Sequence, residues 1–357
     1  MSTERSTSDW YRTFGEVEAR GQSAIYDEWA LGVAGDTEVL ELIDGLPLQK
    51  RQPNLVFATA RLLGSPEGEY SAFRAWLLDN WPRVSAETQN RMTQTNEPRR
   101  CAALLPALAA LHGPVGKPGP TGKPGPTGRQ GSAGKQGSAG KQGPLALLEI
   151  GASAGLCLYP DQYSYRYGDG TGDGDWLHPA SGPSRVLLEA ETVRPIPIPA
   201  ELPTVAWRAG IDLEPLEVRD AVAMHWLETL VWPEQDERRA RIRAAIEIVR
   251  ADPPLLVRGN AVDELAALAA QAPADATLVI ITSGVLVYIP YLERMRLVSA
   301  IKKLGVTWVS LEGVRVVPEI DAQLDNPQPG RFVLARDGKP LAYVGPHGQS
   351  VEWLQGA

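Results

Sequence analysis

The chain contains 357 residues, 43% of them hydrophobic and 22% charged, with a formal net charge of −8 and a pI near 5.2. This length predicts two modest domains, or one large domain with an appendage. The acidic balance argues against a nucleic-acid partner, which would need a basic face. The longest apolar runs are far shorter than the roughly 20 residues of a spanning helix, so no membrane partner is expected.

The cysteines and histidines bear on cellular location and metal chemistry. The two cysteines, Cys101 and Cys157, cannot form a disulfide framework, and residues 1–6 lack the apolar core of a signal peptide. A cytoplasmic location is therefore expected. The four histidines are not spaced like zinc ligands, so no metal site is expected.

Residues 1–112 are expected to form a helical N-terminal region. Apolar residues recur at helical spacing over 54–63, a segment that follows Pro53, and again over 70–80. The pattern predicts a separate helix for each segment.

A further helix is predicted near the end of this region. Thr95 or Asn96 can accept from its first backbone amides, and Pro106 is expected to kink it. Arg99 and Arg100 are expected on a solvated face of this helix.

Residues 113–143 have glycine at every third position, with Pro, Lys, Thr, Ser, Ala and Gln between the glycines. This pattern is typical of collagen. A triple helix of this length would extend roughly 90 Å, at about 3 Å per residue, and would separate a helix from the strand that follows it. We therefore predict a flexible collagen-like insertion.

Residues 144–357 alternate apolar strands with amphipathic helices, and the end of the chain reads as an antiparallel hairpin around Asp337 and Gly338. Near-continuous apolar strands indicate a parallel sheet covered on both faces. The predicted fold class is α/β, a Rossmann-like, mostly parallel sheet with a C-terminal antiparallel hairpin. Five parallel strands are expected at residues 145–150, 205–212, 255–260, 277–282 and 306–312.

The first of these strands ends in a glycine-rich loop, at the edge where open parallel sheets bind ligands. S-adenosylmethionine sites combine an acid on this strand, a glycine turn and a second acid that accepts from the ribose hydroxyls of the cofactor. Glu149 and Asp212 can supply the two acids, although they lie further apart than the roughly 20 residues of the dinucleotide analogue. The expected cofactor-binding residues are Glu149, Gly151, Ser153, Gly155, Asp212, Asn260 and Asp263.

Three alternatives remain for this loop. A dinucleotide is disfavoured because Ser153 stands where the pyrophosphate requires glycine. A serine hydrolase would use Ser153 in the G-x-S-x-G pattern with His347, but in that fold several strands precede the serine. A non-catalytic protein that binds a small-molecule ligand, or serves as an interaction scaffold, would keep the fold without a catalytic base, and no base can be named.

Several segments together resemble an uncharacterised bacterial family known as domain of unknown function 2332. The resemblance implies a class I methyltransferase-like fold, with the helix after Asn96 near the cofactor end of the sheet. Cys157 departs from the asparagine expected in similar sequences, and the glycine repeat is expected to be an insertion peculiar to this chain. The matching segments are residues 94–97, 149–156, 212–215, 231–235 and 346–348.

Overall fold

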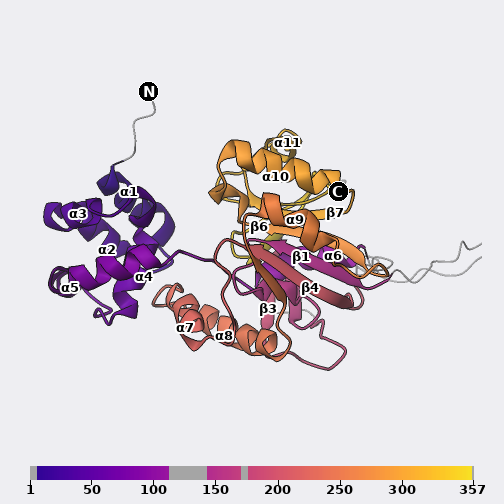
Figure 1. The fold of residues 1–357 in the computed structure, drawn as a ribbon, viewed down its shortest axis with the longest axis horizontal. Helices are drawn as coiled ribbons and strands as arrows, with labels where there is room; N and C mark the ends of the chain where they lie inside the picture. Colours follow the sequence, from indigo (N-terminus) through magenta and orange to yellow (C-terminus); the bar gives the residue numbers. More distant parts are fainter. Residues whose placement is uncertain (1–5, 112–142, 170–175, 356–357) are drawn as a thin grey trace, which may run out of the picture. The chain divides into compact units, whose positions relative to one another are not determined.

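The computed structural model describes residues 6–111, 143–169 and 176–355 (Figure 1). The chain forms two compact units, one of Met1–Thr95 with Leu216–Arg243 and the other of Asn96–Pro215 with Ala244–Ala357. The glycine repeat lies outside the described residues except for Gly143, so its conformation stays a prediction.

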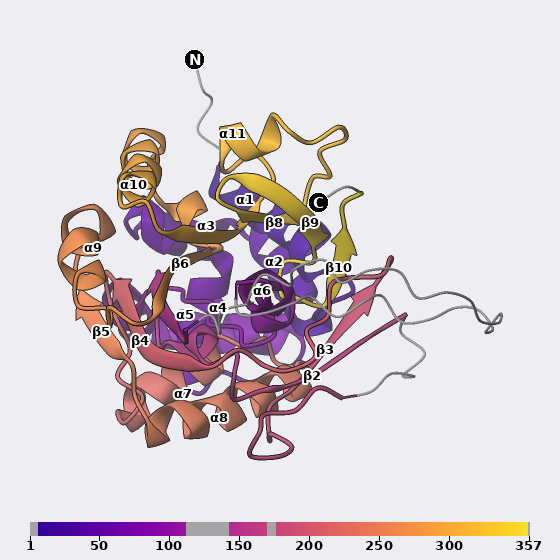
Figure 2. The same cartoon turned by 90° about the vertical axis from the view of Figure 1, so that its right-hand side faces the viewer.

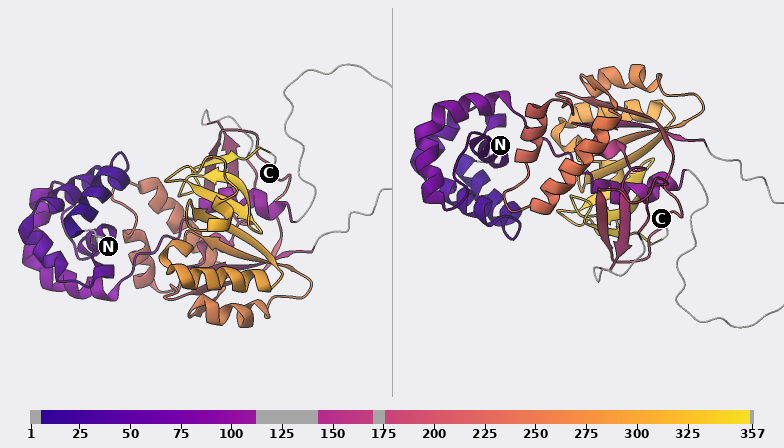
Figure 3. Two further views of the ribbon diagram at one scale, coloured as in Figure 1. Left: turned by 90° about the horizontal axis from the view of Figure 1, so that it is seen from above. Right: turned by 90° about the horizontal axis from the view of Figure 1, so that it is seen from below.

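The first unit is helical, with no strand among its described residues (Figure 3). Pro53 occupies the first turn of α4, where its missing amide costs nothing. α5 runs to Asn90, ten residues beyond the predicted end, because Pro82 is accommodated inside the helix. The elements are α1 (Thr7–Thr13), η1 (Phe14–Ala19), α2 (Ala24–Ala34), α3 (Thr37–Asp44), η2 (Leu48–Lys50), α4 (Pro53–Leu62), α5 (Tyr70–Asn90), α7 (Ala221–Thr229) and the first part of α8 (Asp236–Ala251).

An aromatic core holds this unit together. Trp29 and Phe73 stack with ring centroids 3.9 Å apart, and Tyr26 and Phe57 pack against them. Arg61 joins the later segment of the unit to the earlier one by donating to the carbonyl oxygens of Thr229 and Val231, at 2.9 and 2.8 Å.

The second unit contains a ten-stranded, mostly parallel sheet with the order β2-β3-β10-β9-β8-β7-β6-β1-β4-β5 (Figure 2). The five expected parallel strands are confirmed. The strand order reverses at β1, with β6 and β7 on one side of it and β4 and β5 on the other, as in doubly wound sheets. The strands are β1 (Leu145–Ile150), β2 (Ser164–Gly168), β3 (Leu187–Thr192), β4 (Val205–Asp212), β5 (Leu255–Arg258), β6 (Thr277–Ser283), β7 (Thr307–Gly313), β8 (Phe332–Arg336), β9 (Lys339–Val344) and β10 (Ser350–Trp353).

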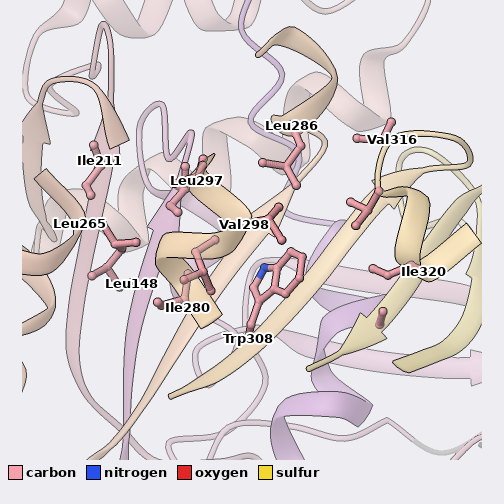
Figure 4. Packing of buried hydrophobic residues seen from close by; sticks show 14 of the residues in the cluster. Leu148, Ile211, Leu265, Ile280, Leu286, Leu297, Val298, Trp308, Val316 and Ile320 are labelled. Atoms are coloured by element: carbon pink, nitrogen blue, oxygen red, sulfur yellow. The ribbon is translucent and has the colours of Figure 1, made fainter. Parts of the chain in front are cut away.

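Helices cover both faces of this sheet. On one face, α9 (Ala261–Ala269), α10 (Tyr291–Lys303) and α11 (Pro318–Asp321) bury a core with Leu148, Ile280 and Trp308 at its centre (Figure 4). On the other face, α6 (Arg100–Ala109) is buried along its whole length and contacts β3, β7 and β8. The helix predicted after Asn96 therefore belongs to the unit that contains the sheet.

The chain between β1 and β4 contains two strands that were not expected. β2 pairs with β3, and β3 pairs with β10 at the far side of the sheet. Buried tyrosines anchor this segment through backbone carbonyls, since Tyr163 donates to Leu156 at 2.6 Å and Tyr167 to Ala102 at 2.8 Å. These strands account for the long separation between Glu149 and Asp212.

β8 and β9 pair antiparallel around a turn in which Asp337 and Gly338 have φ of 51° and 77°, so the expected C-terminal pair is present. None of the helices in the described parts of the chain has the length and apolar character needed to cross a membrane.

A buried ion pair next to the central strand leads to a stability prediction. Arg208 on β4 pairs with Asp161 at 2.7 Å, and both side chains are about nine-tenths buried. Replacing Arg208 by methionine leaves a buried carboxylate without its cation, so we expect a loss of about 3 kcal/mol of unfolding free energy in urea titrations.

Arg258→Met on the adjacent strand β5 is the matched control. Arg258 pairs with Glu214 at 2.8 Å, but both side chains are at least half exposed. Its loss should cost less than about 1 kcal/mol. Equal losses of unfolding free energy for the two variants would contradict the conclusion that the Arg208–Asp161 ion pair is buried and stabilises the fold.

Candidate functional site

The glycine loop lies at the carboxyl end of β1, where the strand order reverses. Gly151, Ser153 and Gly155 have left-handed backbones with φ of 73°, 52° and 75°. A Cβ atom on Gly151 would lie 2.4 Å from Cγ2 of Val285, and one on Gly155 would lie 2.8 Å from Cγ of Pro254. Both glycines are therefore required by the backbone conformation and by close neighbours.

The carboxylate of Asp212 holds this loop in place from the end of β4. Its Oδ2 accepts from the amide of Ser153 at 2.8 Å, and its Oδ1 accepts from the amide of Glu214 at 2.8 Å. The amide of Gly151 donates to the carbonyl oxygen of Ile211 at 2.8 Å. Since each carboxylate oxygen has two lone pairs, Asp212 keeps acceptor capacity after these bonds.

Glu149 is only 2% exposed, between its register partners Gly210 and Ile281. Burial raises the pKa of Glu149 well above its ordinary value; Cys157 and Asp212 also raise it, whereas Arg100 lowers it. Within the described structure, Oε2 of Glu149 has no hydrogen-bond partner. A buried acceptor of this kind favours either a protonated carboxyl or a polar ligand beside it.

Asn260 and Asp263 lie beyond the next strand, β5. The Asn260 side chain accepts from the amide of Val262 at 2.9 Å and so caps α9, while Asp263 is exposed in the first turn of that helix. The amide of Gly259 donates to the carbonyl oxygen of Asp212 at 2.9 Å, so this turn adjoins the glycine-loop edge.

The segment before α6 also reaches the glycine loop. Oδ1 of Asn96 accepts from the amide of Leu156 at 2.9 Å. Leu156 begins the short turn η3 (Leu156–Leu158), which follows the loop directly. Asn96 therefore contacts the backbone of the loop segment rather than the first amides of a helix, and α6 begins only at Arg100.

Arg100 has a different environment from the one expected. It is 6% exposed, so the prediction of a solvated face is wrong for this residue. Its guanidinium donates to the carbonyl oxygens of Ser283 at 2.7 Å and Pro346 at 3.2 Å. Residues 101–109 of α6 are almost all apolar, so the helix has no polar face. This pattern could have predicted that Arg100, the first residue of the helix, is buried.

Glu312, at the end of β7, was not predicted as a site residue. It is 3% exposed, and its two oxygens accept from the amides of Val285 at 3.3 Å and Leu286 at 3.2 Å. Burial raises the pKa of Glu312 to about 7, against the opposing effects of these hydrogen bonds and of Arg100. An acid ending an otherwise apolar strand was the available sequence signal.

A separate hollow of about 760 Å³ lies among the C-terminal strands and the segment before them. No residue of the glycine loop lines it. Its charged lining has both signs and includes Arg194, Arg336, Lys339 and Glu352.

The structure thus defines an α/β protein whose mostly parallel sheet carries a tight glycine loop at its strand-order reversal, next to a buried cluster of one arginine and two carboxyls. The chain belongs to the family described as "Uncharacterized protein conserved in bacteria (DUF2332)", whose model matches residues 8–119 and 135–353. The gap between the two matched ranges falls inside the glycine repeat. No curated protein and no solved structure matches the chain.

The contact over Gly151 can be tested by substitution. Gly151→Ala should cost about 3 kcal/mol of unfolding free energy, because backbone strain is added to a clash with Val285. Gly305→Ala is the control, since Gly305 has φ of 66° with nothing within 4 Å of its Cβ position, and it should cost only about 1 kcal/mol. Adding Val285→Ala should recover the excess cost of Gly151→Ala, and no recovery would rule out the close contact.

The raised pKa of Glu312 predicts how stability depends on pH. The folded protein holds this proton more tightly than the unfolded chain, so the contribution of Glu312 is present below its ordinary pKa of 4.5 and is lost as pH rises to about 7. Glu312→Gln should therefore flatten the fall in unfolding free energy between these values. The exposed Glu319→Gln should leave the slope as it is in the wild type; identical slopes for both variants would refute the assignment.

Proposed function

We propose that the edge of the sheet at Gly151 and Asp212 binds S-adenosylmethionine and that the protein transfers its methyl group to a small molecule or a protein side chain. The ribose hydroxyls would donate to Asp212, and the glycine loop would lie beneath the nucleoside. Asn260 and Asp263 would contribute from the neighbouring turn, and Glu149 from below the loop.

The observation that carries this proposal is the bond between the Asp212 carboxylate and the Ser153 amide, at 2.8 Å. It joins the glycine loop of β1 to the acid that ends β4, at the position where open α/β sheets bind ligands. The carboxylate is half-buried and thus remains open to a ligand on one side. Methyl transfer needs little from the protein beyond aligning the nucleophile with the sulfonium methyl.

Two alternatives remain. The left-handed backbone of Ser153 would suit a hydrolase elbow. Its context opposes that function, because a short turn rather than a helix follows the loop, and no strand precedes β1 among the described residues. A non-catalytic scaffold would bind the cofactor without turnover, and a fluorophosphonate probe that labels Ser153 would identify the hydrolase.

Isothermal calorimetry with S-adenosylmethionine and S-adenosylhomocysteine tests the proposal. Both should bind the wild type. Asp212→Asn should weaken binding by about tenfold, which corresponds to the loss of one charge-assisted hydrogen bond. The exposed Asp325→Asn is the control of equal charge change and should bind as the wild type does.

Near-UV circular dichroism should establish that the variants keep their folds. Absence of heat with either ligand for the folded wild type would refute the cofactor proposal. Binding without transfer of a labelled methyl group to a panel of small nucleophiles would favour the scaffold.

A further inference from the structure

The turn after β6 lies against the glycine loop. Gly284 has φ of 66°, and the next residue, Val285, lies so close to Gly151 that the glycine could not bear a Cβ atom. The Val285 side chain therefore fills the space beside Gly151 in which a Cβ atom would lie. The half-buried side chain of Val285 is positioned to control access to the loop.

Two buried side chains, those of Glu312 and Arg100, hold this turn. The carboxylate of Glu312 accepts from the amides of Val285 and Leu286, while Arg100 donates to the carbonyl oxygen of Ser283. Position 284 requires glycine, because a Cβ atom there would lie only 2.9 Å from Nη2 of Arg100. The turn is therefore anchored at Ser283 by Arg100 and at Val285 and Leu286 by Glu312.

The groups around Glu312 determine the pH at which its carboxyl ionises. From α6, Arg100 favours the ionised carboxyl, as does the hydroxyl of Thr282 on β6. The same guanidinium also has a lowering effect on the pKa of Glu149 on β1 and of the buried thiol of Cys157. Arginine keeps its charge at every physiological pH, so the carboxyls are the groups that titrate.

We propose that the turn of residues 283–286 is a pH-dependent gate over the proposed cofactor site, held closed by the ionised carboxylate of Glu312 and released when that carboxyl is protonated. The inference rests on the proposed function for its ligand. An ionised acceptor forms hydrogen bonds about twice as strong as a neutral one, so protonation loosens both amides. Val285 then moves off Gly151 and a nucleoside can reach the loop backbone.

Amide hydrogen exchange tests the gate in the absence of any ligand, because it measures how well the amides of the turn are protected. Protection of the Val285 and Leu286 amides, relative to the Gly259 amide, should fall by about tenfold from pH 8 to pH 6, a change equal to about 1.4 kcal/mol. Gly259 is a suitable reference because its amide donates to a backbone carbonyl at the same edge of the sheet. Equal relative protection at the two pH values overturns the gate.

Two variants distinguish the effect of the Glu312 carboxylate from that of the Val285 side chain. Glu312→Gln should give low protection of both amides at pH 8 as well as at pH 6, while Glu319→Gln should match the wild type. If Glu312→Gln retains the wild-type protection at pH 8, the gate is overturned. Should that variant not fold, Val285→Ala supplies the test through binding kinetics.

Stopped-flow binding of S-adenosylhomocysteine completes the test. Association with the wild type should be about tenfold faster at pH 6 than at pH 8, and Val285→Ala should associate rapidly at both. Association of Val285→Ala that is as slow as the wild type at pH 8 overturns the gate. Glu312-dependent amide protection without any ligand binding overturns the cofactor proposal alone.

Discussion

The bond between the Asp212 carboxylate and the Ser153 amide is the constraint around which the sheet edge is organised. The amide of Gly151 already ties the start of the loop to Ile211 of β4, and the Asp212 carboxylate adds a second tie at Ser153, whose backbone is left-handed. The same carboxylate holds its own following turn through Glu214, and its backbone carbonyl receives the Gly259 amide. One residue thus ties together the turns that follow β1, β4 and β5.

Below this edge, the protein buries three ionisable groups, and such buried groups contribute little net stability by themselves. Arg100, Glu149 and Glu312 are each less than a tenth exposed. Their arrangement is useful in another way, because Arg100 and Glu312 fix the turn that carries Val285 against Gly151. These two side chains therefore fix the turn above them, and in the proposed gate the position of that turn depends on the ionisation of Glu312.

Sequence reasoning predicted the parallel strands because their apolar runs end at glycines and polar residues, a strong local signal. It missed β2 and β3, although Tyr165 and Tyr167 alternate with polar residues in β2 and Leu188 and Ala190 alternate with glutamates in β3. The buried tyrosines of β2 bond to backbone carbonyls, and these contacts are not visible in the sequence. The acids and glycines of the loop could be found from their type and position. Arg100 and Glu312 could not be assigned, because their roles depend on contacts between residues more than 20 positions apart.

The central claim is that Asp212 and the glycine loop form one nucleoside site. Diffraction from crystals grown with S-adenosylhomocysteine tests it most directly. The account predicts density for an adenosyl group over Gly151, with both ribose hydroxyls within hydrogen-bond distance of the Asp212 carboxylate and Val285 displaced from its position over the glycine. An adenosyl group bound elsewhere, or an edge at Gly151 still closed by Val285 in saturating ligand, would contradict it.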